Sequence, residues 1–304
     1  MLYLSSRAEE LVKNCCFLAG PGRSGSTLWG RILGTMQKTC YLYEPEFLHA
    51  LFPASSWMQN KIFRFLFEAF LYEEKFINTV SGRSLNFNKN DLSSIYKIKK
   101  NNEIKTLISK KWTKTKVASF FRNYRCIVKL TDNTMYLEKI STNYQTVFSV
   151  ITHRNAEDCI RSLILKKWFS NSSLSSLVRV WPSRQRHGLV IPHWVPDNKI
   201  KNWVKWPEAQ RAAFYYQTLL SSVPKRKNQI VASYENLVTN PRKEISRISD
   251  FLNLKPSAVT KSLISEIKKP VHTNFNFWCQ VDQCTRKICE SLSCHKQYSN
   301  KICI

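Results

Sequence analysis

Residues 14–36 combine an apolar run, a glycine-rich turn and a helical pattern, and they constrain the fold more than any other part of the chain. The run NCCFLAG precedes the turn PGRSG, after which Leu28, Ile32 and Leu33 recur at helical spacing. The chain has only 7 glycines in 304 residues, and five of them lie in this stretch. Because glycine adopts positive φ and lets a ligand approach peptide N–H groups, the clustering predicts a strand, an anion-binding turn and a helix. A merely flexible loop is the alternative.

The turn lacks one residue of the nucleotide-binding P-loop. The motif G-x-x-x-x-G-K-[ST] places a lysine after its last glycine, whereas Gly25 is followed by Ser26 and Thr27. The N–H groups from Ser24 to Thr27, the hydroxyls of Ser24, Ser26 and Thr27, the helix N-terminus and the Arg23 guanidinium remain as anion ligands. The turn therefore favours a phosphate or sulfate group.

Further apolar runs at 40–44, 126–130 and 146–152 alternate with helical patterns. We expect an α/β fold with a P-loop-like, doubly wound parallel sheet flanked by helices, and a right-handed βαβ unit at its start. QIVASYENL predicts a strand and a turn, and PRKEISRISDFLNL an amphipathic helix.

We expect a single domain over residues 1–304. Residues 51–121 are expected to be a helical insertion with polar breaks. Residues 170–207 hold four prolines and four tryptophans and are expected to be an irregular loop that shapes a pocket or covers the core.

The chain is strongly basic, with 47 Lys and Arg against 21 Asp and Glu and a net charge of +26. This charge favours an anionic ligand, polymer or membrane surface as partner. Between Lys97 and Lys129, eleven basic residues face the single acid Glu103. That run is a candidate surface for an acidic polymer, and a solvated helical face is the alternative.

No apolar run approaches the ~18 residues of a membrane-spanning helix, and the first residues lack the apolar core of a signal peptide. We therefore expect a cytoplasmic protein without a transmembrane segment. The ten cysteines are expected to be mostly reduced thiols, because a chain of this size does not need disulfides. Four cysteines spaced five residues apart near the C-terminus do not converge on one helix face, so we expect no metal site.

The strand, turn and helix at 15–36 resemble the donor-binding entrance of the sulfotransferases, which use 3'-phosphoadenosine 5'-phosphosulfate (PAPS) and no metal. In that family the Walker lysine is absent and a basic residue lies earlier in the turn, as Arg23 does here. The resemblance implies that the turn binds the donor and that Arg23 also stabilises the transition state. The implied donor ligands are Gly22, Arg23, Ser24, Gly25, Ser26 and Thr27.

A second stretch, VFSVITHRNAEDCIRSLI, is similar to the family's strand, Arg-x-Pro and following Ser. The resemblance implies that Arg154 and Ser162 bind the 3'-phosphate, although Ala156 departs from the usual proline. The blocks VKLTDNTMYLEKI and SYENLVTNPRKEISRISDFLNL extend the likeness, and the latter implies that Tyr234 lies in the donor site. The likeness is thin over residues 51–121, where acceptor-specific parts are expected.

YLYEP, residues 41–45, resembles carbohydrate 6-O-sulfotransferases and makes Glu44 the first candidate for the general base. Glu46 and His49 are alternatives, and Glu44 capping a turn or pairing with a basic residue is the structural alternative. Lys129 is a candidate point charge beside the ligands. His153 is expected to pack or to contact the nucleotide.

The resemblance implies an enzyme that moves a sulfuryl group from PAPS to a hydroxyl, that of a carbohydrate or glycoconjugate, and releases adenosine 3',5'-bisphosphate. A kinase or NTPase is disfavoured by the missing lysine. A basic adaptor that binds an acidic glycan or nucleic acid through residues 97–129 is the alternative outside enzymes.

Overall fold

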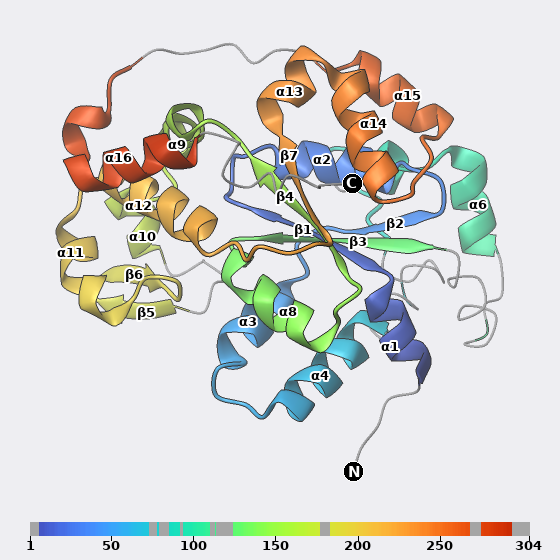
Figure 1. Cartoon of the computed structure of the whole chain (residues 1–304), viewed down its shortest axis with the longest axis horizontal. Helices are drawn as coiled ribbons and strands as arrows, with labels where there is room; N and C mark the ends of the chain where they lie inside the picture. The colour runs from blue at the N-terminus through green and yellow to red at the C-terminus, as the bar shows by residue number, and fades with distance from the viewer. Residues whose placement is uncertain are drawn as a thin grey trace.

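The computed structural model describes residues 6–72, 78, 85–91, 94–109, 113, 124–176, 183–267 and 275–293. Within these residues, five parallel strands form the central sheet in the order β2-β3-β1-β4-β7 (Figure 1). The strands are β1 (Cys15–Gly20), β2 (Thr39–Leu42), β3 (Arg125–Thr131), β4 (Phe148–His153) and β7 (Gln229–Ser233). The predicted parallel α/β sheet is therefore confirmed.

Both faces of the sheet are buried, as the continuous apolar runs predict for parallel strands. In β1, Cys15, Phe17 and Ala19 pack into one core cluster, while Cys16 and Leu18 pack into the other. The same alternation runs along the neighbouring strands, because successive side chains of a strand point to opposite faces. The sheet is thus the middle layer of a doubly wound fold.

Helices cover each face of the sheet (Figure 1). One face carries α2 (Ser26–Gly34), α13 (Tyr234–Thr239), α14 (Pro241–Phe251) and α15 (Ala258–Ser265). The other carries α1 (Ser6–Lys13), α3 (Glu46–Ala54), α4 (Asn60–Ala69) and α8 (Leu137–Asn143), with the 3-10 turn η3 (Thr134–Tyr136) before α8.

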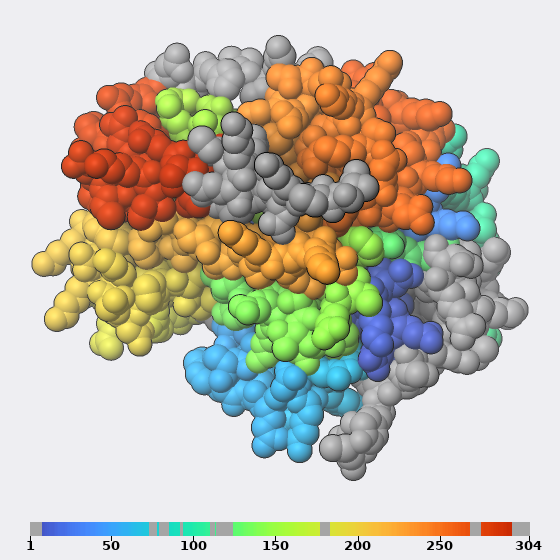
Figure 2. Space-filling view, in the orientation of Figure 1, coloured from blue at the N-terminus to red at the C-terminus, as the bar shows by residue number. Residues whose placement is uncertain are grey.

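A third group of helices packs beside the sheet. The helix α12 (Glu208–Ser221) contacts α9 (Ala156–Leu165) and α16 (Gln283–Leu292), and the 3-10 turn η5 (Trp278–Gln280) lies next to α12. Figure 2 shows α16, in red, seated on the surface beside the segments from the second half of the chain. This group brings α12 close to the ends of the strands.

The segment 170–207 is more regular than expected. It contains α10 (Asn171–Ser175), an antiparallel hairpin of β5 (Ser183–Arg186) and β6 (Leu189–Pro192), η4 (Asp197–Lys199) and α11 (Ile200–Lys205). Trp194 and Trp203 are buried and lie edge-on to one another, with ring centroids 5.2 Å apart. These two tryptophans cover the core.

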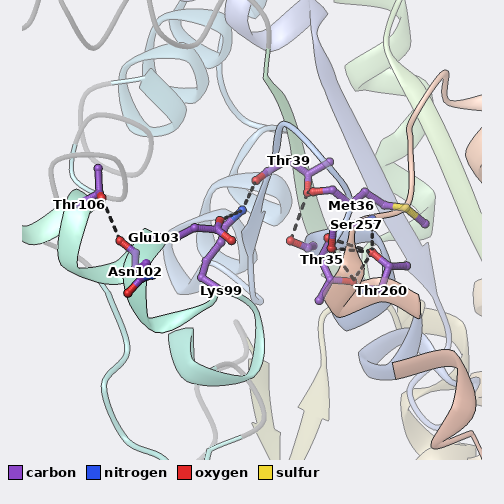
Figure 3. Close-up of polar contacts among 10 residues, drawn as sticks. Thr35, Met36, Thr39, Lys99, Asn102, Glu103, Thr106, Ser257 and Thr260 are labelled. Carbon is purple, nitrogen blue, oxygen red and sulfur yellow. Dashed lines mark hydrogen bonds and ion pairs between the residues drawn. The ribbon is translucent and has the colours of Figure 1, made fainter. Parts of the chain in front are cut away.

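Polar contacts fix two helices to the rim of the sheet (Figure 3). Lys99, between η2 (Ile95–Lys97) and α6 (Asn101–Ser109), donates to the carbonyl of Thr39 at 3.3 Å. On α15, Thr260 accepts a hydrogen bond from the hydroxyl of Thr35 at 3.1 Å and donates to the Thr35 carbonyl at 2.9 Å. These bonds hold α6 beside β2, and α15 beside the end of α2.

One local expectation needs correction. The YENL sequence forms helix α13 rather than a turn, since Ser233 caps it by accepting from the backbone N–H of Asn236 at 3.2 Å. The sheet order also shows that β1 and β2, the strands of the expected βαβ unit, are not neighbours, because β3 lies between them and pairs with both.

Other expectations concern charge, thiols and membranes. Much of the basic run, including Lys110, Lys111, Lys114, Lys116 and Arg122, lies outside the described residues.

Each of the cysteines in the described ranges is a free thiol. Among the helices that the structure describes, none is long and apolar enough to cross a membrane.

Candidate active site

The carboxyl ends of four strands bring separate segments of the chain to one edge of the sheet. The register pairs Gly20 at the end of β1 with Thr131 at the end of β3, and Ala19 with Ile151 of β4. The turn after β1, the residues after β3, the Arg154 segment after β4 and the Glu44 segment after β2 therefore lie together. In parallel sheets this edge is where ligands bind.

The turn after β1 is held by its own hydrogen bonds. Ser24 is fully buried; its hydroxyl donates to the Pro21 carbonyl at 2.6 Å and shares a hydrogen bond of 2.7 Å with the Thr152 hydroxyl. Arg23 has φ 68°, a left-handed conformation that is rare outside glycine. The Ser24 hydroxyl, predicted as an anion ligand, is thus committed to the shape of the turn.

Gly25 ends the turn and begins α2. Its φ is 88°, and a Cβ there would lie 2.5 Å from Cδ2 of Tyr234. The helix that follows has no side-chain cap, so the N–H groups of its first turn, with Ser26 and Thr27, stay open to a ligand. A helix N-terminus of this kind attracts anions.

Gly22 has a different role from the one predicted. Its backbone N–H donates to the Tyr215 hydroxyl at 2.5 Å, and the Cys159 thiol donates to its carbonyl at 3.3 Å. A Cβ at this position would lie 2.4 Å from Cζ3 of Trp168. Gly22 thus allows close packing of α9 and α12 against the turn, and its amide already has a protein partner.

Two guanidinium groups meet at the turn. Arg23 Nε donates to the Ser162 hydroxyl at 3.1 Å, and Arg154 Nη1 donates to the Arg23 carbonyl at 3.2 Å. The Arg154 guanidinium lies 4.6 Å from the centroid of the Tyr234 ring. Arg154 Nε is buried and has no hydrogen-bond partner among the described residues. The structure thus brings Arg23, Arg154, Ser162 and Tyr234, four of the predicted donor-site residues, into contact with one another.

Ala156 stands where the family pattern has a proline, and helix α9 still begins at this residue. Asn155 caps α9 by accepting from the backbone N–H of Glu157 at 2.9 Å. His153 is fully buried, and its Nε2 lies 2.8 Å from the Leu292 carbonyl of α16. The expected packing role of His153 is consistent with this position.

Lys129 and Glu44 form an ion pair at the same edge. Lys129 Nζ lies 2.8 Å from Glu44 Oε1, donates to the Thr27 hydroxyl at 2.9 Å and sits 4.4 Å from the centroid of the Tyr43 ring. The period of two along β3 places Lys129 on the face that α2 covers, with Ile127. A lysine from another strand therefore reaches the start of α2, where the turn itself has none.

The ion pair sets the charge of the carboxylate. Burial raises the pKa of Glu44, but the attraction and hydrogen bond of Lys129 outweigh burial, so the pKa lies below its usual value. Burial lowers the pKa of Lys129, and Glu44 opposes this shift. Glu44 is consequently an ionised, half-buried carboxylate at neutral pH.

The alternatives to Glu44 occupy different positions. Glu46 is exposed at the start of α3. His49 is buried, and its Nδ1 lies 2.9 Å from Nδ2 of Asn133. Burial lowers the pKa of His49, which the nearby Glu44 opposes.

Sequence reasoning missed two buried residues that touch the turn. The Tyr215 hydroxyl, which accepts from Gly22, donates to the carboxylate of Asp132. Asp132 directly follows the buried strand β3, and a polar pair such as Asp132–Asn133 at that point is a usable signal. No sequence signal marks Tyr215, because it stands in an ordinary helical pattern 193 residues from Gly22.

The model of the sulfotransferase family matches residues 16–257. No curated protein sequence matches the chain significantly.

Solved structures similar to the chain include the sulfotransferase domain of the curacin biosynthetic pathway, at 14% identity and a TM-score of 0.47, covering 91% of this chain and 96% of that one. The sulfotransferase domain of the Synechococcus olefin synthase shares 14% identity with a TM-score of 0.46, covering 92% and 94%. A sulfotransferase of Mycobacterium tuberculosis shares 14% identity with a TM-score of 0.41, covering 94% and 78%.

Proposed function

The chain belongs to the sulfotransferase family, and we propose that it transfers a sulfuryl group from PAPS to a hydroxyl of a carbohydrate or glycoconjugate. The family match over residues 16–257 makes the protein a sulfotransferase enzyme. The family generally uses PAPS as donor. The acceptor class, the donor contacts and the general base are our proposals for this chain.

One observation carries the donor assignment: cationic groups from three separate segments converge on the open start of α2. Arg23 comes from the turn, Arg154 from the end of β4 and Lys129 from β3. The buried Arg154 Nε, which has no hydrogen-bond partner in the described part of the chain, fits a phosphate oxygen. The residues present thus suit a ligand with two anionic ends, one at the turn and one beside Arg154 and Ser162.

When bound, PAPS supplies a sulfuryl group attached to a phosphate leaving group. The N–H groups of Ser26 and Thr27 and the Arg23 guanidinium are fixed before the reaction, so they stabilise the charge that grows on the leaving phosphate. Lys129 adds a positive charge at Thr27, 2.9 Å from its hydroxyl. Arg154 and Ser162 hold the other end of the donor.

Glu44 is the proposed general base. The acceptor oxygen forms a bond to sulfur as the bond from sulfur to the leaving phosphate breaks, and the hydroxyl proton moves to the Glu44 carboxylate. Lys129 outweighs burial and lowers the pKa of Glu44, so the carboxylate is ionised at neutral pH, and the same ion pair makes it a weaker base. Its ion pair with Lys129 also orients the carboxylate beside α2.

Two exposed aromatic residues flank Glu44 in the sequence and support a sugar as acceptor. Tyr43 is 40% exposed and Phe47 is 42% exposed, so each keeps part of its ring at the surface. An aromatic ring offers a flat apolar surface that suits the C–H face of a pyranose while hydroxyls stay in water. The ring of Phe47 is held in place by stacking on Phe70, with centroids 4.7 Å apart.

The proposal is tested with sulfur-35-labelled PAPS and a panel of acceptors: glycans with free primary hydroxyls, steroid alcohols and simple phenols. We expect label transfer to glycans, with one adenosine 3',5'-bisphosphate released for each group transferred. Transfer only to steroids or phenols would contradict the acceptor class. Binding of heparin without label transfer to any acceptor would favour the adaptor function.

A further inference from the structure

A buried hydrogen-bond chain connects the donor-binding turn to the end of β3. The Gly22 N–H donates to the Tyr215 hydroxyl at 2.5 Å, and that hydroxyl donates to the carboxylate of Asp132. Tyr215 is 0% exposed and Asp132 is 3% exposed. Neither residue is among those proposed to touch the donor or the acceptor.

We infer that Tyr215 and the ionised form of Asp132 are positioning residues, which hold the Gly20–Gly25 turn in its anion-binding shape. Protonation of Asp132 then loosens the turn and weakens donor binding. This inference rests on the proposed donor site in the same turn.

The turn needs external support because its backbone is unfavourable on its own. Arg23 has φ 68°, a left-handed backbone conformation that is unfavourable for a residue with a side chain. Ser24 fixes the turn on the β4 side through Thr152. The bond from Gly22 to Tyr215 fixes it on the α12 side, so its loss frees one side of the turn.

The direction of the hydrogen bonds requires a strong acceptor at Asp132. A carboxylate only accepts, so the Tyr215 hydroxyl donates to it and keeps its oxygen for the Gly22 N–H. A hydrogen bond to an ionised acceptor is about twice as strong as one to a neutral acceptor. A protonated Asp132 would accept more weakly and would bring a buried O–H that needs an acceptor of its own.

Asp132 titrates near neutral pH in these surroundings. Burial raises its pKa to about 7, although hydrogen bonds from the Tyr215 hydroxyl and from the backbone N–H of Gly22 oppose this shift. Of the charged groups that face Asp132, Glu44 raises the pKa and Lys129 lowers it. On the α9 side, the Cys159 thiol faces Tyr215 and stays neutral, because burial raises its pKa to about 12.

The first test observes Gly22 directly in the free protein. Pro21–Gly22 is the only Pro-Gly pair in the sequence, so carbon-13 carbonyl proline with nitrogen-15 glycine isolates one amide signal in NMR. We expect this signal to shift with pH in the wild type, with a midpoint of about 7, and to show no such titration in Asp132→Asn. A Gly22 signal that is insensitive to pH in the wild type would overturn the inference.

The second test measures the affinity for adenosine 3',5'-bisphosphate by calorimetry across pH. Asparagine mimics the protonated carboxyl, so Asp132→Asn should bind roughly tenfold more weakly than the wild type above neutral pH and equally well at acidic pH. Tyr215→Phe should bind roughly tenfold more weakly above neutral pH and show the same loss of pH sensitivity. The phosphates of the ligand also titrate, so the ratio of variant to wild type at each pH is the quantity to compare.

Tyr144→Phe is the matched control, because Tyr144 also donates from a buried hydroxyl to a carboxylate, that of Glu68 at 2.6 Å, but this carboxylate belongs to α4 and not to the donor-binding turn. It should lose stability without losing affinity. Equal affinity in folded Tyr215→Phe and wild type would overturn the inference. A wild type that binds no bisphosphate at any pH would refute the proposed function instead, and the NMR titration would still decide the inference.

Discussion

The ammonium of Lys129 lies 2.8 Å from Oε1 of Glu44, and its hydrogen bond to the Thr27 hydroxyl at 2.9 Å links the pair to the start of α2. One lysine on β3 thus contacts both the proposed base and the helix N-terminus that is proposed to hold the leaving phosphate. A P-loop lysine reaches its phosphates from the turn itself. Here the positive charge belongs to Lys129 on β3, the strand next to β1.

Replacement of Lys129 by methionine should move the acid limb of the kcat profile to higher pH. The substitution removes the attraction that lowers the pKa of Glu44 and leaves the burial that raises it. Lys139→Met is the control, because the Lys139 ammonium also lies over an aromatic ring, that of Phe63, but donates to the Ser55 carbonyl rather than to a carboxylate. A profile of Lys129→Met that superimposes on the wild type would show that this ion pair does not govern the base.

Replacement of Glu44 by glutamine should lower kcat by about 10²–10⁴-fold, the usual contribution of a general base. The affinity for adenosine 3',5'-bisphosphate should change little, because Glu44 is proposed to serve the acceptor. Glu46→Gln, two residues away and exposed at the start of α3, should keep its activity. The assignment is wrong if the two variants exchange these behaviours.

Replacement of Gly25 by alanine should weaken both folding and donor binding. A φ of 88° costs alanine about 1–2 kcal/mol. The new Cβ would also lie 2.5 Å from Cδ2 of Tyr234, which is too close, so the ring would have to move. Gly188→Ala is the comparison, since Gly188 also has a positive φ of 72° but has no atom within 4 Å of a Cβ. Urea unfolding should show a loss in both variants, and calorimetry a loss of affinity only in Gly25→Ala.

Asp132 should destabilise the protein as pH rises. Its pKa is raised from 3.8 to about 7 on folding, so between these values the folded state binds one more proton than the unfolded state. Stability from this group is therefore present below pH 3.8 and is lost as pH rises through about 7. The unfolding free energy of Asp132→Asn, relative to the wild type, should increase over this window, which urea unfolding at each pH measures.

The amino-terminal part of the site could be predicted from the sequence because its signals are local. The apolar run, the clustered glycines and the helical spacing of Leu28, Ile32 and Leu33 identify β1, the turn and α2 without knowledge of any partner. Arg154 follows its strand directly, so its place at the sheet edge also follows from local order.

The contacts that complete the site are not local and leave little trace in the sequence. The position of β3 between β1 and β2 depends on long-range pairings: Cys15 of β1 pairs with Cys126, and Thr39 of β2 pairs with Arg125. Tyr215 reaches Gly22 from a helix whose pattern only indicates burial. The hairpin strand SRQR has no apolar residue, so periodicity could not reveal it.

The central claim is that Arg154 and the turn form a site for a nucleotide with phosphates at both the 3' and 5' positions. Its most direct test is calorimetry of adenosine 3',5'-bisphosphate against adenosine 5'-monophosphate, with the wild type, Arg154→Ala and the control Arg286→Ala. Arg286 also lies over an aromatic ring, that of Trp278, but it belongs to α16 and pairs with Glu290. We predict that the wild type and the control bind the bisphosphate about 10–100-fold more tightly, and that Arg154→Ala loses most of this preference. Equal affinity of the wild type for the two nucleotides, or a full preference in Arg154→Ala, would contradict the claim.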